Sequence, residues 1–79
     1  MADQFDHDVE LDARGMACPI PLIQTKLMLN SMQSGEVIKV IATDAGTVRD
    51  FQTHCRLAGH EVIKQTEEGP LILHWIRRG

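Results

Sequence analysis

The amino-acid sequence predicts an α/β two-layer sandwich, in which two helices lie on one face of a four-stranded mixed sheet in the order βαβαββ. Three observations support this fold. The chain has 79 residues, which suits one small domain and leaves no room for a second core. Its composition, 43% hydrophobic and 24% charged, is ordinary for a globular protein. Strand-like and helix-like hydrophobic patterns alternate along it.

The first half of the chain reads as strand, helix and strand. Val9–Ala13 alternates apolar and polar residues, as a half-buried strand does. A loop follows with Gly15 as its turn residue. A helix is predicted from Pro19 to Gln33, and Gly35 ends it. Residues 37–42 are β-branched and nearly all apolar, which indicates a strand with neighbours on both sides.

The second predicted helix begins after a turn at residues 44–46. Thr47 and Asp50 fit a capping box, in which their side chains satisfy free backbone N–H groups. The helix runs to about Ala58, and Gly59 stands where a left-handed cap is expected.

Two strands complete the chain, at residues 61–65 and 71–76, with a turn at residues 67–70. The two strand–helix–strand units are expected to be right-handed crossovers that give parallel pairs. The last two strands are expected to form an antiparallel hairpin. Placing both helices on one face of the mixed sheet is the economical packing.

Charge and hydropathy exclude several classes of function. The net charge is −3 and the pI about 5.7, which argues against direct nucleic-acid binding. No apolar run is long enough for a membrane span. Residues 1–8 are acidic and lack the features of a signal peptide, so we expect a flexible acidic tail before a single domain at residues 9–79. We therefore expect a cytoplasmic protein with two free thiols, Cys18 and Cys55.

Cys18-Pro19-Ile20-Pro21 is the candidate site. Proline is tolerated in the first turn of a helix, where its missing N–H needs no partner. With Pro19 at the first helical position, Cys18 becomes the N-cap residue at the positive end of the helix dipole. Since Pro21 has no N–H to offer, the amide of Ile20 is the main donor expected for a Cys18 thiolate.

This position predicts a moderately activated thiolate. A helix N-terminus stabilises a negative charge by roughly 0.3–1 kcal/mol, and by up to ~2 kcal/mol where the site is partly buried. At about 1.36 kcal/mol per pKa unit, the pKa of the Cys18 thiol is expected to fall from ~8.5 to between about 7 and 8. Arg14 adds to this effect if its loop folds toward the sulfur.

Group transfer suits such a thiol better than hydrolysis. A lone cysteine hydrolyses amides only with a base and an oxyanion hole, and the sequence ties none of its four histidines to Cys18. A thiolate that accepts sulfur from a persulfide and passes it on needs only a donor and an acceptor. Free cysteines are often buried filler, but no packing argument requires sulfur at a helix N-cap. We expect no cofactor and no metal, since zinc-ligand spacing is absent from the sequence.

The run from Leu11 to Pro21 resembles the L-D-x-x-G-x-x-C-P-x-P signature of the TusA/SirA-like sulfur-carrier (sulfurtransferase) family. The similarity covers about residues 9–78 and includes Gly35-Glu36, Asp44, Arg49-Asp50 and Gly59-His60-Glu61. It implies the βαβαββ sandwich and a carrier-type sulfurtransferase that holds a persulfide on Cys18. The supporting residues would be Gly15, Pro19, Ile20, Pro21 and Arg14.

The resemblance also implies partners. A cysteine desulfurase or a rhodanese would donate sulfur, and a DsrE-type sulfurtransferase would accept it. The pathway would be tRNA thiolation, molybdenum-cofactor supply or dissimilatory sulfur oxidation. We expect a monomer without membrane contact. The alternative is a small nucleic-acid-binding or regulatory module, which a salt-dependent RNA shift that persists in Cys18→Ser would support.

Other features have simpler interpretations. Cys55 shares a predicted helix face with Val48, Phe51 and Ala58, so we interpret it as structural filler rather than as a resolving cysteine. Histidines near it are interpreted as surface or rim residues.

The predicted first helix has two apolar groups. The face suited to the sheet contains Leu22, Thr25, Met28, Leu29 and Met32. A different side contains Ile20, Ile23 and Leu27. For that side we favour contact with the second helix over a docking patch beside Cys18. Three arginines, Arg49, Arg77 and Arg78, are expected to form a solvated rim. The alternative is a basic edge that docks an acidic partner.

Overall fold

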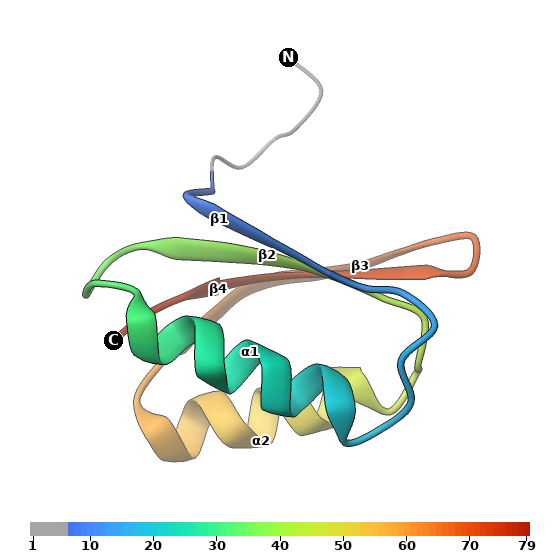
Figure 1. Ribbon diagram of the computed structural model, residues 1–79, viewed down its shortest axis with the longest axis horizontal. Helices are drawn as coiled ribbons and strands as arrows, with labels where there is room; N and C mark the ends of the chain where they lie inside the picture. The colour runs from blue at the N-terminus through green and yellow to red at the C-terminus, as the bar shows by residue number, and fades with distance from the viewer. Residues whose placement is uncertain (1–6) are drawn as a thin grey trace.

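The structure is a computed structural model that describes residues 7–79. Both helices cover the same face of a four-stranded sheet, which confirms the predicted two-layer sandwich (Figure 1). The order βαβαββ is also confirmed: β1 (Val9–Ala13), α1 (Ile20–Ser31), β2 (Val37–Ala42), α2 (Thr47–Ala58), β3 (Glu61–Glu68) and β4 (Leu71–Arg77).

The predicted tail falls largely outside this part of the chain. Its residues 1–6 lie outside the described residues. At its last position, the N–H of Asp8 donates a hydrogen bond of 2.8 Å to the carbonyl of Val37 at the start of β2. Within residues 7–79 no helix is long and apolar enough to cross a membrane.

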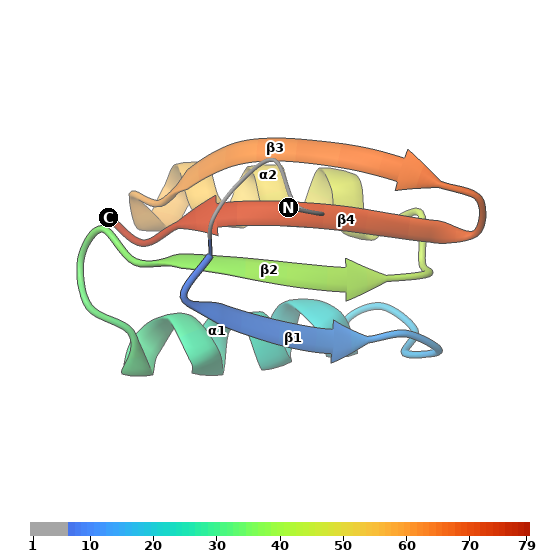
Figure 2. The ribbon, with the colours of Figure 1, turned by 90° about the horizontal axis from the view of Figure 1, so that it is seen from above.

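The strand order in the sheet is β1-β2-β4-β3 (Figure 2). β1 and β2 are parallel, as predicted, and β3 and β4 form the predicted antiparallel hairpin. The predicted pairing of β2 with β3 is wrong, because β4 lies between these two strands and pairs antiparallel with both. The burial of β4 explains this, since Ile72–Ile76 is continuously buried and such a run suits an internal strand.

The parallel pair brings two loops to the same end of the sheet. Ala13, at the end of β1, is in register with Ala42, at the end of β2. The loop from β1 to α1 and the loop from β2 to α2 therefore leave the sheet side by side (Figure 2). Cys18 lies in the loop between β1 and α1, so the topology makes residues of the loop between β2 and α2 its neighbours.

The core lies between the sheet and the helices. Alternate residues of the strands point into it, and each helix contributes one face. Its buried members are Ala13, Leu29, Met32, Ile38, Val40, Phe51, Cys55 and Ile76. Cys55 is only 2% exposed, so its predicted place in the core is confirmed.

The helix ends differ from the prediction in detail. α1 is shorter than expected, and Pro19 rather than Cys18 is its N-cap residue. The predicted capping box at the start of α2 is wrong, because Gly46 is the N-cap residue and no side chain caps the helix. At the other end of α2, Gly59 has a φ of 84° and confirms the left-handed cap.

The two apolar groups of α1 differ in burial. Of the face expected on the sheet, Thr25, Leu29 and Met32 are buried. On the other side, Ile20, Ile23 and Leu27 are 43%, 45% and 60% exposed. The interpretation that α2 covers this second group is therefore wrong.

Candidate functional site

Cys18 is an exposed free thiol in the loop between β1 and α1. The Cys18–Pro19 peptide bond is cis, and α1 begins at Ile20 with Pro19 as its N-cap residue. The predicted N-cap position of Cys18 is therefore wrong by one residue. The error has a physical reason. Pro21 lies in the first turn whether the helix begins at Pro19 or at Ile20, so the preference of proline for the first turn does not decide between the two starting points.

The two groups expected to stabilise a thiolate are engaged elsewhere. The amide of Ile20 donates a hydrogen bond of 2.9 Å to the carbonyl of Ala17. The guanidinium of Arg14 donates to both carboxylate oxygens of Asp12, at 2.9 and 2.8 Å. This interaction lowers the pKa of Asp12 to about 2. Neither group therefore serves the sulfur as predicted.

Two carboxylates hold Cys18 instead. The thiol Sγ donates a hydrogen bond of 3.0 Å to Oδ2 of Asp50, in the first turn of α2. The backbone N–H of Cys18 donates one of 2.7 Å to Oδ2 of Asp44. The hydrogen bond to Asp50, followed by desolvation and the negative charges of Asp50 and Asp44, raises the pKa of the Cys18 thiol. The predicted fall in this pKa is therefore wrong in sign.

Asp44 joins the two loops at this end of the sheet. Its second oxygen, Oδ1, accepts a hydrogen bond of 2.9 Å from the N–H of Gly46. The two backbone hydrogen bonds lower the pKa of Asp44. A second link runs from the N–H of Gly15 to Oγ1 of Thr43, at 2.9 Å. Gly15 has a φ of 79°, which confirms it as the turn residue of the Cys18 loop.

A buried hydrogen-bond chain supports the loop between β2 and α2, which holds Asp44, from inside the core. The amide nitrogen of Gln65 can only donate, so Nδ1 of His74, at 3.0 Å, is the acceptor. Nε2 of His74 then carries the proton and donates to Oγ1 of Thr47, at 3.0 Å. Thr47 in turn donates to the carbonyl of Asp44, at 2.7 Å. Burial lowers the pKa of His74 to about 4, which keeps the ring neutral as this chain requires.

An open hollow lies beside the thiol. Cys18 lines it from one loop, and the end of the β2–α2 loop with the first turns of α2 supplies the rest: Ala45, Gly46, Val48, Arg49, Asp50 and Gln52. Arg49 therefore belongs to the surroundings of Cys18. The alternative of one basic edge finds no support, because Arg49 lies beside Cys18, whereas Arg77 pairs with Glu61 at 2.8 Å and Nε of Arg78 donates to the carbonyl of Leu29.

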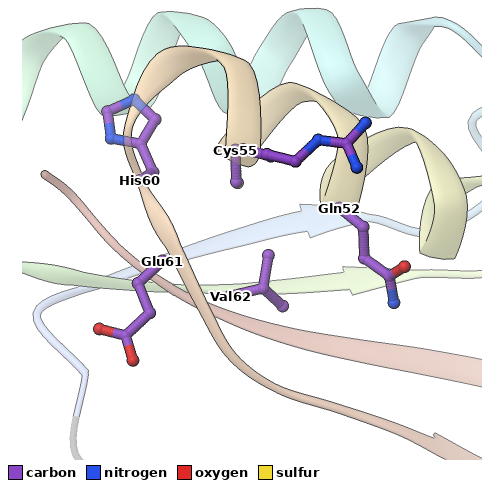
Figure 3. A pocket seen from close by; sticks show the side chains of 6 residues that line it. Gln52, Cys55, His60, Glu61 and Val62 are labelled. Carbon is purple, nitrogen blue, oxygen red and sulfur yellow. The ribbon is translucent and has the colours of Figure 1, made fainter.

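The second thiol lies in a different setting. Figure 3 shows the Cys55 side chain pointing from α2 toward the sheet, beside a hollow lined also by Gln52, Arg56, His60, Glu61 and Val62. Burial raises the pKa of the Cys55 thiol to about 11. Among residues 7–79, His, Cys, Asp and Glu side chains form no group that could hold a metal ion.

Asp44 and Asp50 are the site residues that sequence reasoning missed as contacts of Cys18, the first through its backbone and the second through its sulfur. A signal for them existed in the topology, since residues that follow the carboxyl ends of adjacent parallel strands converge at one edge of a sheet. Cys18 follows β1 and Asp44 follows β2. The capping-box pattern links Asp50 to the backbone of α2 and gives no sign of a contact with the sulfur.

Comparisons with known proteins agree with this architecture. The sequence model of the family described as "Sulfurtransferase TusA" matches residues 9–78. The chain is 48% identical over 64 residues to "Sulfur carrier protein TusA" of Allochromatium vinosum, covering 81% of this chain and 84% of that protein. It is 43% identical over 72 residues to "Sulfur carrier protein TusA" of Pseudomonas entomophila, covering 91% and 90%.

A solved structure shows the same fold. The crystal structure of a SirA-like protein from Desulfitobacterium hafniense superposes with a TM-score of 0.80 at 24% sequence identity, covering 91% of this chain and 99% of that one. The fold and the sequence matches together place the protein in the class of small sulfur carriers. The chain belongs to the TusA family of sulfurtransferases.

Proposed function

We propose that this protein carries sulfane sulfur as a persulfide on Sγ of Cys18. The observation that supports it most is the exposure of this thiol in a loop tied at both its backbone and its sulfur. Cys55 offers no comparable surface, because it is buried in the core. A carrier must reach two successive partners, so the thiol it uses must be open to solvent.

The proposed reaction is an exchange that conserves atoms and charge. A donor persulfide R–S–SH meets the Cys18 thiol, and a bond forms between Sγ and the outer sulfur of the donor. The S–S bond of the donor breaks, and the donor leaves as the thiol R–SH, so that Cys18 holds –S–SH. The same exchange in the next step passes the outer sulfur to an acceptor thiol and restores Cys18.

The surroundings of Cys18 suit contact with proteins. Ile20 and Ile23 form exposed apolar surface on the first turns of α1. We propose a cysteine desulfurase or a rhodanese as donor and a DsrE-type sulfurtransferase as acceptor, as the family resemblance implies. We further propose that the relay works in the cytosol, where free thiols such as Cys18 and Cys55 stay reduced.

The loop geometry is proposed to keep the sulfur available. Gly15 adopts the positive φ that turns the loop, and Pro19 and Pro21 fix the start of α1. Arg14 makes no contact with the sulfur, and its proposed role is to hold the start of the loop through its ion pair with Asp12. These residues therefore support the loop, and Cys18 alone carries the sulfur.

Intact mass after incubation with a cysteine desulfurase and cysteine tests the proposal. The wild type is expected to gain about one sulfur, roughly 32 Da, by persulfide exchange. Cys18→Ser is expected to abolish the gain. Cys55→Ser, with its fold checked by circular dichroism, is expected to keep it. A gain that is lost only in Cys55→Ser would overturn the assignment.

A further inference from the structure

The Cys18 sulfur contacts the carboxylate of Asp50, a group that can accept a proton during sulfur exchange. Oδ2 of Asp50 lies 3.0 Å from Sγ, on a different element from the cysteine. A carboxylate can only accept, so the proton of this hydrogen bond sits on sulfur. The free protein therefore presents Cys18 as a thiol, although the thiolate is the nucleophile in sulfur exchange. The proton must leave as the reaction proceeds.

We propose that Asp50 is a second catalytic residue of sulfur transfer, which holds Cys18 in its protonated form until a donor arrives and then takes up the thiol proton as Sγ attacks. This inference rests on the proposed function. As the Sγ–sulfur bond forms and the donor S–S bond breaks, the proton moves from Sγ to Oδ2 of Asp50. Asp50 then releases it to water, and the leaving thiolate of the donor takes one proton up. The net change is the exchange already written.

The other charged groups near the sulfur do not fit this role. Both oxygens of Asp44 already accept backbone N–H groups, from Cys18 at 2.7 Å and from Gly46 at 2.9 Å. These bonds lower the pKa of Asp44 and make it a poor proton acceptor. Arg49 lines the same hollow as a cation, and Arg14 is paired with Asp12. Asp50 is the carboxylate whose bond is made to the reacting atom.

The structure also holds Asp50 on a rigid element. Its N–H donates to the carbonyl of Gly46, at 3.1 Å, inside the first turn of α2. Thr47, in the same turn, is anchored by His74 and by the carbonyl of Asp44. A proton acceptor that must meet one sulfur atom benefits from such support, because catalytic geometry tolerates little movement.

Two measurements on Asp50→Asn decide whether Asp50 accepts the thiol proton or only holds Cys18 in position. The first is the rate of Cys18 alkylation by iodoacetamide against pH. The second is the rate of sulfur loading from glutathione persulfide at neutral pH, followed by intact mass. Removing the charge of Asp50 favours the thiolate, so alkylation at neutral pH is expected to rise several-fold. Loading is expected to fall about tenfold or more, since a positioned base contributes at least this much.

Control variants test the carboxylate itself. Asp50→Glu keeps the acid and is expected to recover most of the loading rate. Glu68→Gln removes the same charge from an exposed position of β3, an element that contributes no residue to the hollow beside Cys18. It is expected to leave both rates within about twofold, as surface charges act weakly at a distance. Circular dichroism of each variant checks the fold.

Opposite changes in the two rates of Asp50→Asn support the proposal, because a merely structural role would move both in the same direction. Loading that rises together with alkylation, or that does not change, overturns it and leaves the carrier function intact. A wild-type protein that takes up no sulfur from either donor overturns the carrier function, and the role of Asp50 with it.

Discussion

The two cysteines of this chain are both held as thiols, but for different physical reasons. Cys18 lies in an exposed loop, and a hydrogen bond to a neighbouring carboxylate raises its pKa. Cys55 lies under α2 with 2% of its surface exposed, and burial raises its pKa to about 11. A docking molecule can break the contact with Asp50, whereas burial is undone only when the domain opens. The first thiol is restrained by a contact that a partner can replace, and the second is shielded by its burial in the folded state.

The largest expected difference between the two thiols is their rate of alkylation in the native protein. Cys18 is expected to react directly, and Cys55 at least about 100-fold more slowly, because it must wait for the core to open. Mass spectrometry of the peptides that contain each cysteine follows both rates. In denaturing urea the two rates are expected to converge. Similar rates in the native protein would contradict the comparison.

Acid is expected to weaken the fold through His74, which supports the loop between β2 and α2 from the buried side. Its pKa is about 4 in the folded state against 6.5 for an ordinary histidine. Between pH 6.5 and pH 4, the histidine is protonated in the unfolded chain but stays neutral in the folded chain. The free energy of unfolding is therefore expected to fall by up to about 3 kcal/mol between pH 6.5 and 4. The midpoint of urea unfolding measures this loss.

The matched control for this loss is a variant with His54→Gln and His60→Gln, two partly exposed histidines. Burial also lowers the pKa of both, but neither belongs to the buried hydrogen-bond chain that supports the loop. The variant is expected to keep most of the acid loss. An imidazole of His74 that titrates near 6.5 in an NMR experiment would show that this histidine does not cause the loss.

The same substitution at the two cysteines sharpens the comparison further. Cys55→Ser places a hydroxyl in an apolar core and is expected to cost about 1–3 kcal/mol of unfolding free energy. Cys18→Ser keeps a donor for Asp50 at an exposed position and is expected to stay within ~0.5 kcal/mol of the wild type. Urea unfolding compares the two. Equal costs would show that Cys55 is not the packed residue described.

The smallest expected effect on stability belongs to Ile20→Lys, which adds a charge beside Cys18 on exposed surface. The free energy of unfolding is expected to change by less than ~0.5 kcal/mol. Alkylation by a small reagent is expected to hold or rise slightly, since a cation favours thiolate. Transfer to a protein acceptor is expected to slow sharply. Unchanged transfer would mean that partners dock elsewhere, and equal loss in both assays would mean a damaged thiol.

The sequence predicted the elements well because their signals are local. Alternation in Val9–Ala13 and the apolar run at Val37–Ala42 each lie within one strand, and both strands have the predicted bounds. Gly59 ends α2 through its own backbone conformation. Such signals depend on neighbours along the chain, so they can be read without knowing the fold.

The environment of the thiol was harder to predict because it depends on contacts far apart in the chain. The approach of Asp44 to Cys18 follows from the register of Ala13 with Ala42, which no local pattern reveals. The frame of α1 was ambiguous by one residue, and that residue decided whether the helix or Asp50 would face the sulfur. The site residue itself was predictable from its motif, but its protonation was not.

The most direct test of the central claim is to locate the sulfur in the wild-type protein without any substitution. After partial loading by a cysteine desulfurase and cysteine, the persulfide is trapped with an alkylating reagent and the protein is cut with trypsin. Residues 15–26 carry Cys18 and residues 50–56 carry Cys55. We predict that the extra sulfur, roughly 32 Da, is found in residues 15–26. Sulfur found instead in residues 50–56 would contradict the account.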